Sequence, residues 1–536
     1  MSARNMAPRG RYFCAVATFA ERKATMGLAL AVGGVNMSNC LDRPAFADRA
    51  CEAAGFAAGL FHRSNLVVTR MPKVAGSLVK YPARVSFFWY LGLIVAGTLL
   101  LRQPLSRGNP VQPISWLDAA FTSTSAACVT GLAVRSTPND FSLFGQIVIL
   151  VLIQLGGIGI MTVTTFVVFH LGARARLRHR AILTQTLGAD EQADLNWILR
   201  NVLLITFLFE GIGFALLAFR NLFEMPRDVS LAVGIADALW HAMFHSVSAF
   251  CNAGFALHDD SLTRYQGDFY VNGVISVLII AGGIGFPVIL DVKHKWQSGS
   301  DDWWHDLHIH SKTMLIGTAA LLVGGAVVFT ILEWDGVLRD LPWHRRVLVP
   351  VFHSVSCRTA GFNTIELARL TNASLFVSIL LMAIGAGACS TGGGIKVSTV
   401  MLLVYQAWSR FRGYERVHVF GRTIPRPAID RATATVMLFS VAAVIALTLL
   451  LMIEQSSVSH LDTKGVFLEA IFEVASALGT VGLSTGLTTQ LTNLGRVIII
   501  VLMFLGRLGP ISVFAALSRN DQEDPVQYAK EEPLVG

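Results

Sequence analysis

The chain has 536 residues, of which 53% are hydrophobic and only 15% are charged, and its mean hydropathy is +0.56. A water-soluble domain of this length cannot bury so much apolar surface, so the composition excludes a soluble protein and indicates a polytopic membrane protein. The net charge of +8 includes many basic residues in loops beside hydrophobic segments, which the positive-inside rule explains better than a nucleic-acid partner.

Residues 1–84 precede the first hydrophobic segment and are interpreted as a cytoplasmic N-terminal extension. The most apolar run among them, residues 26–35, has about half the length that a spanning helix needs. Basic residues precede this run, but a cleaved signal sequence fits them only loosely. We expect an extension that is partly disordered, or a true start at Met71.

Eight hydrophobic segments follow, each long enough to cross a bilayer. They lie near residues 85–101, 144–170, 198–219, 271–290, 313–333, 374–404, 433–453 and 495–517. The region between the two segments of each pair is too short and too polar to cross, which indicates a re-entrant pore helix surrounded by protein and water. The sequence therefore predicts an all-α integral membrane protein in which four pseudo-repeated span–pore helix–span modules surround one central pore. These modules cover residues 85–180, 181–295, 296–416 and 417–519, and a cytoplasmic tail covers 520–536.

Basic residues assign the two sides of the membrane. They cluster before the first segment and after the second, fourth and sixth: Arg70, Lys73, Lys80, Arg84, Arg174, Arg176, Arg178, Arg180, Lys293, Lys295, Arg410, Arg412 and Arg416. The positive-inside rule places these loops and both termini in the cytoplasm. Arg339, Arg345 and Arg346 fall on the opposite side, so the bias is real but not absolute. Each pore helix then enters the membrane from outside.

One short pattern occurs in every module: Phe-x-x-x-Ser, followed by a tight turn that ends in glycine. Selective passage of a dehydrated cation needs a ring of oxygen atoms in place of the lost water. Backbone carbonyl groups supply such a ring where glycine permits unusual backbone angles, and the partly negative end of each preceding helix also favours a cation. The four turns therefore predict a cation filter made of Val129, Thr130, Gly131, Asn252, Ala253, Gly254, Thr359, Ala360, Gly361, Thr480, Val481 and Gly482.

The runs TSTSAACVTGL, HSVSAFCNAGF, SVSCRTAGFNT and SALGTVGLSTG resemble the Trk/Ktr/HKT superfamily of potassium transporters over about residues 80–517. Eight segments without an additional first pair are most similar to the Ktr-type membrane subunit. The resemblance implies potassium ions at the four filter turns, a homodimer, and a cytoplasmic ring of nucleotide-binding regulatory subunits. In the plant relatives, serine in place of the first filter glycine accompanies sodium transport, so Gly131 favours potassium. Arg358, just before the third turn, departs from the pattern.

The second segments contain another internal repeat, Gly157-Ile-Gly159, Gly283-Ile-Gly285, Gly394-Ile-Lys396 and Arg507-Leu-Gly509. Glycines here let a helix bend or approach its neighbours. Two copies carry a cation, Lys396 and Arg507. An ionisable residue at membrane depth is a functional candidate, although Lys396 could also reach the cytoplasmic interface.

The third module contains five glycines within residues 384–394. Such a stretch does not hold a helix against its backbone entropy, and an unwound segment beneath the third turn would obstruct the pore. The resemblance implies an intramembrane gating loop here; a kinked, tightly packed helix is the alternative. The gate residues are therefore predicted to be Gly385, Gly387, Ser390, Thr391, Gly392, Gly393, Gly394, Lys396 and Arg507.

The remaining polar residues of the pore helices do not form a catalytic set. His245, His353 and Glu473 occupy one slot of the repeat, where structural hydrogen bonding is a simpler interpretation than a proton relay. No P-loop or HExxH motif is present, so no enzyme activity and no cofactor are expected.

The sequence thus predicts potassium uptake across the cytoplasmic (inner) membrane, with potassium as substrate and membrane lipid as surroundings. A sodium or mixed sodium/potassium transporter of the same superfamily is one alternative. A secondary transporter with broken helices is another, but it predicts inverted halves rather than four repeats in the same direction. Coupling to sodium or protons stays open.

Overall fold

Helices make up almost all of the chain that the structure describes. The computed structural model describes residues 82–108, 113–174, 195–224, 230–299, 302–455, 459, 463 and 465–509, all within the compact unit Val74–Gly536. Within these ranges the strands form one antiparallel hairpin, β1 (His418–Val419) and β2 (Arg422–Thr423). The predicted all-α fold class is confirmed. The predictions for residues 1–81 and 510–536 lie outside the described residues.

Four long helices begin the four predicted modules. They are α4 (Pro82–Leu101), α9 (Leu195–Phe223), α14 (Ile309–Glu333) and α18 (Arg426–Gln455). Each contains a stretch long and apolar enough to cross a membrane, and these are the four unbroken helices of the described residues that meet that criterion. The first span of every module therefore lies where the sequence predicts it.

The second segments are less regular than predicted. They are α7 (Leu143–Arg174), α11 (Phe269–Ile284) with α12 (Phe286–Gln297), α16 (Asn372–Ala383) with α17 (Val397–Phe411), and α21 (Asn493–Leu508). The prediction of a continuous span over 271–290 is wrong, since α11 and α12 are bent by 98°. Gly285 lies at the bend with φ of 101°, and Pro287 cannot donate a helical hydrogen bond there. Eight complete spans remain a prediction.

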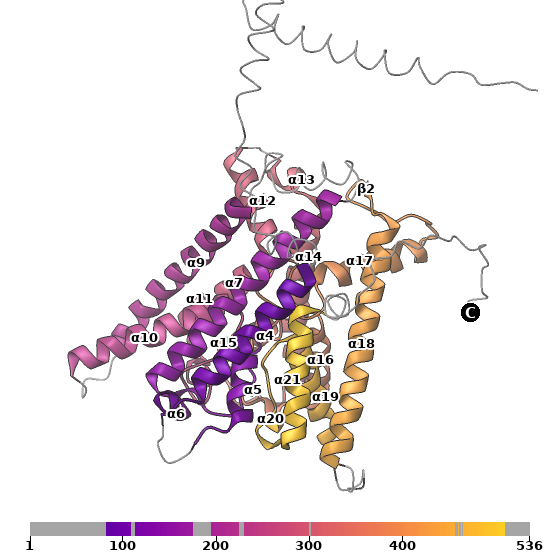
Figure 1. The fold of residues 1–536 in the computed structure, drawn as a ribbon. Helices are drawn as coiled ribbons and strands as arrows, with labels where there is room; N and C mark the ends of the chain where they lie inside the picture. The colour runs from indigo at the N-terminus through magenta and orange to yellow at the C-terminus, as the bar shows by residue number, and fades with distance from the viewer. Residues whose placement is uncertain are drawn as a thin grey trace, which may run out of the picture. The chain divides into compact units, whose positions relative to one another are not determined.

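The segment between each pair of spans contains a helix, as expected for pore helices. These are α5 (Trp116–Ala127), α10 (Leu231–Phe250), α15 (Trp343–Ser356) and α19 (Val466–Gly479). Short helices complete the connections: η1 (Pro104–Ser106), α6 (Thr137–Asp140), η2 (Thr263–Tyr265), α13 (Trp303–Asp306), η3 (Leu367–Arg369) and α20 (Leu487–Gln490). Figure 1 shows the long helices running side by side across the bundle, with α9 and α10 splayed to one edge.

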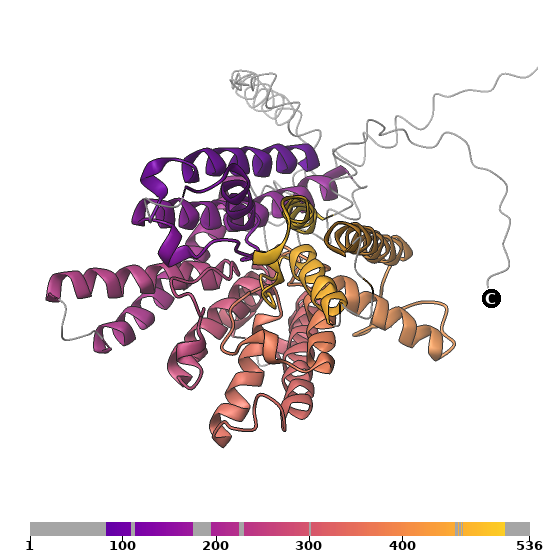
Figure 2. The same ribbon diagram turned by 90° about the horizontal axis from the view of Figure 1, so that it is seen from below.

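The four modules follow one another around a common centre, which Figure 2 shows from indigo through magenta and orange to yellow. The last module returns to the first, because Tyr90 and Phe121 share an apolar cluster with Ile499 and Leu502 of α21. An ionic contact ties the same modules together. Buried Asp118 of α5 accepts hydrogen bonds from Arg496 Nη1 of α21 at 2.8 Å and from Arg135 Nε at 3.0 Å.

Candidate functional site

Each pore helix ends in the same backbone turn. The first residue of each filter turn, at the cap of the pore helix or one or two residues after it, has positive φ: Val129 (55°), Asn252 (60°), Thr359 (68°) and Thr480 (50°). The glycine two residues later has positive φ as well: Gly131 (97°), Gly254 (70°), Gly361 (77°) and Gly482 (92°). L-residues with side chains rarely adopt this region, so four equivalent pairs reflect a conformation that the surrounding fold imposes.

The four turns meet in one closed ring, in which each glycine touches the next module. A Cβ atom at Gly131 would lie 2.5 Å from the carbonyl oxygen of Ala253, and one at Gly254 would lie 2.9 Å from that of Ala360. A Cβ at Gly361 would lie 2.5 Å from the oxygen of Val481. The ring closes where Gly482 abuts the carbonyl oxygen of Thr130. All twelve residues of the predicted filter therefore come together, and only glycine fits at four of them.

The serine of the repeated pattern holds each turn to its own pore helix. Ser125 Oγ accepts a hydrogen bond from the Gly131 N–H at 3.0 Å, and Ser476 Oγ accepts one from the Gly482 N–H at 3.1 Å. In the second and third modules the serine donates instead. Ser248 Oγ donates to the Phe255 carbonyl at 2.7 Å and Ser356 Oγ to the Phe362 carbonyl. The repeated serine is thus explained by a buried side chain that fixes either the last residue of the filter turn or the residue that follows it.

The side chains that occupy the polar slot of the pore helices form hydrogen bonds within the protein. His245 Nε2 accepts from the Leu257 N–H at 3.4 Å, and a His353 ring nitrogen lies 2.9 Å from Ser378 Oγ. Glu473 accepts hydrogen bonds from Ser484 and from Thr488, the latter at 2.6 Å. These partners support the structural interpretation of the slot.

The glycine-rich stretch of the third module is not helical, as expected. It interrupts the segment between α16 and α17, and its two ends meet in a parallel bridge between Ile384 and Ile395. The Gly385 N–H donates to the Ile395 carbonyl at 2.8 Å. We call residues 384–395 the intramembrane loop.

The intramembrane loop lies directly against the ring. The Gly393 N–H donates to Thr480 Oγ1 at 3.0 Å, and Gly392 packs so closely on Thr359 Oγ1 that a side chain would not fit. The loop therefore touches the turns of the third and fourth modules.

The loop also fills the bend of the second module. The Thr391 N–H donates to the Gly282 carbonyl at 3.1 Å, and the Phe286 N–H donates to the Cys389 carbonyl at 3.1 Å. A Cβ atom at Gly285 would collide with the carbonyl oxygen of Ala388. The bend between α11 and α12 and the loop are therefore complementary parts of one arrangement.

Three basic side chains hold the backbone of the intramembrane loop. Arg507 is 3% exposed and donates to the Thr391 carbonyl of the loop and, at 2.8 Å, to the Gly156 carbonyl of α7. Lys396 Nζ donates to the Gly392 carbonyl at 2.6 Å. Buried Arg358 donates to the Gly385 carbonyl at 3.2 Å. None of the ion pairs among the described residues includes these three cations, so backbone carbonyls compensate their charge.

These contacts bear on the internal repeat of the second segments. Gly156, Gly282 and Gly506 each pack on a pore-helix carbonyl group, so Arg507 follows the same close contact as Gly157 and Gly283 do. Gly394 lies in the loop with φ of 66°, in agreement with the unwound stretch predicted for residues 384–394. Arg358, which the sequence left without a role, is anchored on the loop.

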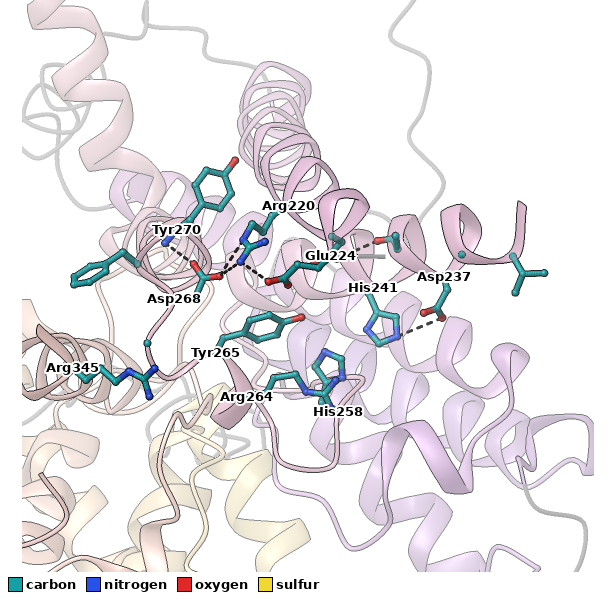
Figure 3. Close-up of a pocket in the computed structure, with 16 residues that line it drawn as sticks. Arg220, Glu224, Asp237, His241, His258, Arg264, Tyr265, Asp268, Tyr270 and Arg345 are labelled. Carbon is teal, nitrogen blue, oxygen red and sulfur yellow. Dashed lines mark hydrogen bonds and ion pairs between the residues drawn. The ribbon is translucent and has the colours of Figure 1, made fainter. Parts of the chain in front are cut away.

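A separate cavity of about 1210 Å³ opens between α9, α10 and α11, away from the ring (Figure 3). Arg220 pairs with Asp268 at 2.9 Å and with Glu224 at 2.5 Å, and His241 lies 3.6 Å from Asp237. Burial, with the neighbouring His241 and Arg264, lowers the pKa of His258 to about 3. The cavity contains none of the predicted filter or gate residues, and no sequence pattern pointed to it.

Comparison with known proteins identifies the family. A family model described as TrkH, cation transport protein, matches residues 91–526. The chain is 37% identical to Ktr system potassium uptake protein B of Vibrio alginolyticus, over 84% of this chain and 94% of that protein. It is 34% identical to the potassium/sodium uptake protein NtpJ of Enterococcus hirae, over 84% and 95%.

A solved structure has the same fold. The crystal structure of the potassium transporter TrkH from Vibrio parahaemolyticus matches with a TM-score of 0.63 at 19% identity, over 81% of this chain and 84% of that one. The family model, the relatives and the apolar helices agree that this is a multi-pass membrane protein rather than an enzyme. The chain belongs to the TrkH family of cation transport proteins.

Proposed function

We propose that the chain takes up potassium through a selectivity filter formed by the four-turn ring. The observation that carries the proposal is the closed contact between each filter glycine and the carbonyl group of the next module. A fixed ring of backbone oxygens can replace the hydration shell of a monovalent cation. The C-terminal ends of α5, α10, α15 and α19 lead into this ring, and their partial negative charge favours a cation over an anion.

Potassium is the preferred substrate in this proposal for two reasons. Two relatives at 35–37% identity are named potassium uptake proteins, and glycine is the last residue of all four filter turns. The name of the Enterococcus hirae relative favours mixed potassium and sodium uptake as a second candidate. The two candidates differ only in selectivity, which a flux assay with each ion separates.

The intramembrane loop acts as the gate in this proposal. It lies against Thr359 and Thr480 of the ring, and Arg358, Lys396 and Arg507 hold it through its carbonyl groups. Three positive charges beside an ion path also repel a passing cation, by roughly 3 kcal/mol for one charge at ~6 Å and an effective dielectric of ~20. Opening of the pore therefore requires the loop and the three basic side chains that bind it to move.

The remaining features follow the family resemblance. The chain works as a homodimer in the inner membrane with both termini in the cytoplasm. A cytoplasmic ring of nucleotide-binding subunits moves the gate. The helices α12 and α17, which are joined to the bend and to the loop, are the parts through which such a subunit reaches the gate.

The filter assignment is tested by Gly131→Ser. The added Cβ would meet the Ala253 carbonyl at 2.5 Å, so we expect the potassium-over-sodium ratio to fall by about tenfold, or ~1.4 kcal/mol of differential stabilisation. Rubidium and sodium uptake into proteoliposomes measure it. Gly421→Ser is the matched control, because Gly421 has φ of 73° but open space around it. Unchanged selectivity in Gly131→Ser would remove this turn from the filter.

The gate assignment is tested by deleting residues 386–393. The flanking residues are adjacent, since a Cβ at Gly394 would lie 3.2 Å from Gly385 Cα, so the shortened chain can be rejoined without moving α16 or α17. We expect basal rubidium uptake to rise and its response to regulation to be lost, with selectivity retained. Normal membrane abundance with lower uptake would instead indicate a structural segment.

Arg507 is predicted to hold the intramembrane loop in its closed position. Arg507→Ala removes hydrogen bonds that join α21 to the loop and to α7, and we expect basal potassium flux to increase severalfold at unchanged selectivity. Arg507→Lys keeps the positive charge but loses the planar guanidinium that donates to two carbonyl groups at once. The flux of this variant should lie between those of the parent and the alanine variant. Reduced flux in Arg507→Ala at normal protein level would show that the arginine only supports the open structure.

A further inference from the structure

An apolar cavity lies behind the pore helix of the fourth module. Its volume is about 200 Å³, and α16, the end of the intramembrane loop, α18 and α19 contribute its walls. The lining residues are Ile379, Ala383, Ile395, Phe439, Ser440, Ala443, Val444, Leu447, Ile471, Val474, Ala475, Leu478 and Gly479. The hydroxyl of Ser440 is the one polar side-chain group among them.

The cavity opens on the exposed apolar face of α18. Ser440 and Val444 line it and are themselves exposed, Val444 by 64%. Beside this mouth α18 presents further apolar side chains, of which Val441 is 53% and Ile445 55% exposed. The spanning stretch of α18 is 17% buried, the lowest value among the four unbroken spans of the described chain. The mouth is therefore continuous with a membrane-facing surface.

Only a hydrocarbon occupant suits these walls. Water needs two or more polar partners in a cavity, and the lining offers one exposed hydroxyl. An empty space of this size would forfeit the dispersion contacts of every wall residue. At membrane depth the surrounding apolar material is the lipid tail. We propose that an acyl chain of a membrane phospholipid occupies this cavity as a specific site.

The inner wall connects the site to the ion path. Leu478 and Gly479 directly precede the ring residue Thr480, and Ile395 closes the intramembrane loop through its hydrogen bond from Gly385. The Gly479 carbonyl oxygen also lies 3.2 Å from a Cβ position on Gly394. An acyl chain in the cavity therefore supports the loop and the fourth pore helix together, and this role rests on the proposed gating function.

Two measurements test the proposal on purified protein in proteoliposomes. In the first, phospholipids with a photoreactive group on the acyl chain are crosslinked, and the adducts are mapped by peptide mass spectrometry. We expect adducts on the cavity walls of α18 and α19, and their loss in Ala443→Phe, whose ring fills the space. Val441→Phe is the control, since this residue lies on the lipid-facing side of the same helix and should leave the adducts in place.

The second measurement compares rubidium flux in straight-chain and methyl-branched phospholipids with the same headgroup. A methyl-branched chain is thicker than a straight one and fits a cavity of this volume less well. We therefore expect the flux of the parent and of Val441→Phe to differ by about threefold or more between the two lipids, a size typical of coupling between distant sites. Ala443→Phe should show no difference. Ala475→Leu fills the cavity from α19 and replaces Ala443→Phe if that variant does not fold.

The outcomes distinguish a failure of the proposed lipid site from a failure of the proposed gating function. Cavity adducts that persist in both filled variants, crosslinks to a second copy of the chain instead of lipid, or equal flux differences in all variants would overturn it. Failure of the gating function would show itself differently, as an unchanged flux after deletion of residues 386–393, while the photoadducts are read without any ion gradient.

Discussion

The contact between each ring glycine and the carbonyl group of the next module is the constraint on which the structure depends. It exists only if four turns adopt positive φ at two residues each, and only if no side chain separates them. Isolated turns would not hold this conformation, because the first residue of each pair carries a side chain and is strained at positive φ. The serine hydrogen bonds, the pore helices and the closure of module four onto module one through Asp118 and Arg496 together impose it.

The intramembrane loop uses glycine for a different purpose. At the ring, glycine permits backbone angles; in the loop, it permits close approach to Thr359, Thr480 and the bend at Gly285. A loop made mostly of glycine and other small residues has little apolar surface to bury, so its position depends on hydrogen bonds. Charged donors make the stronger hydrogen bonds to carbonyl groups, and three of them converge here. These hydrogen bonds hold the segment, and the proposed gating requires only that a few of them break.

Much of this arrangement could be predicted from the sequence because it repeats. Four copies of Phe-x-x-x-Ser followed by glycine identified all twelve residues that now form the ring, and the glycine content of 384–394 indicated an unwound segment. The bend at Gly285 could not be predicted, since an apolar run containing glycine and proline also fits a kinked span. The bend packs against the Ala388 carbonyl, more than a hundred residues away, and this contact is not visible in the local sequence. The anchoring of Arg358 was missed for the same reason: its partners, Gly385 and Thr318, are distant in sequence, and a lone cation in an apolar run carries no signal of what it contacts.

The central claim is that the four-turn ring binds the transported ion through backbone oxygens. The most direct measurement is an experimental structure determined with thallium or rubidium in place of potassium, using anomalous scattering to locate the ion. The account predicts an ion peak within the ring, at bonding distance from the carbonyl oxygens of Thr130, Ala253, Ala360 and Val481. A ring without an ion peak, together with a peak in the separate cavity between α9, α10 and α11, near Asp268 and Glu224, would contradict it.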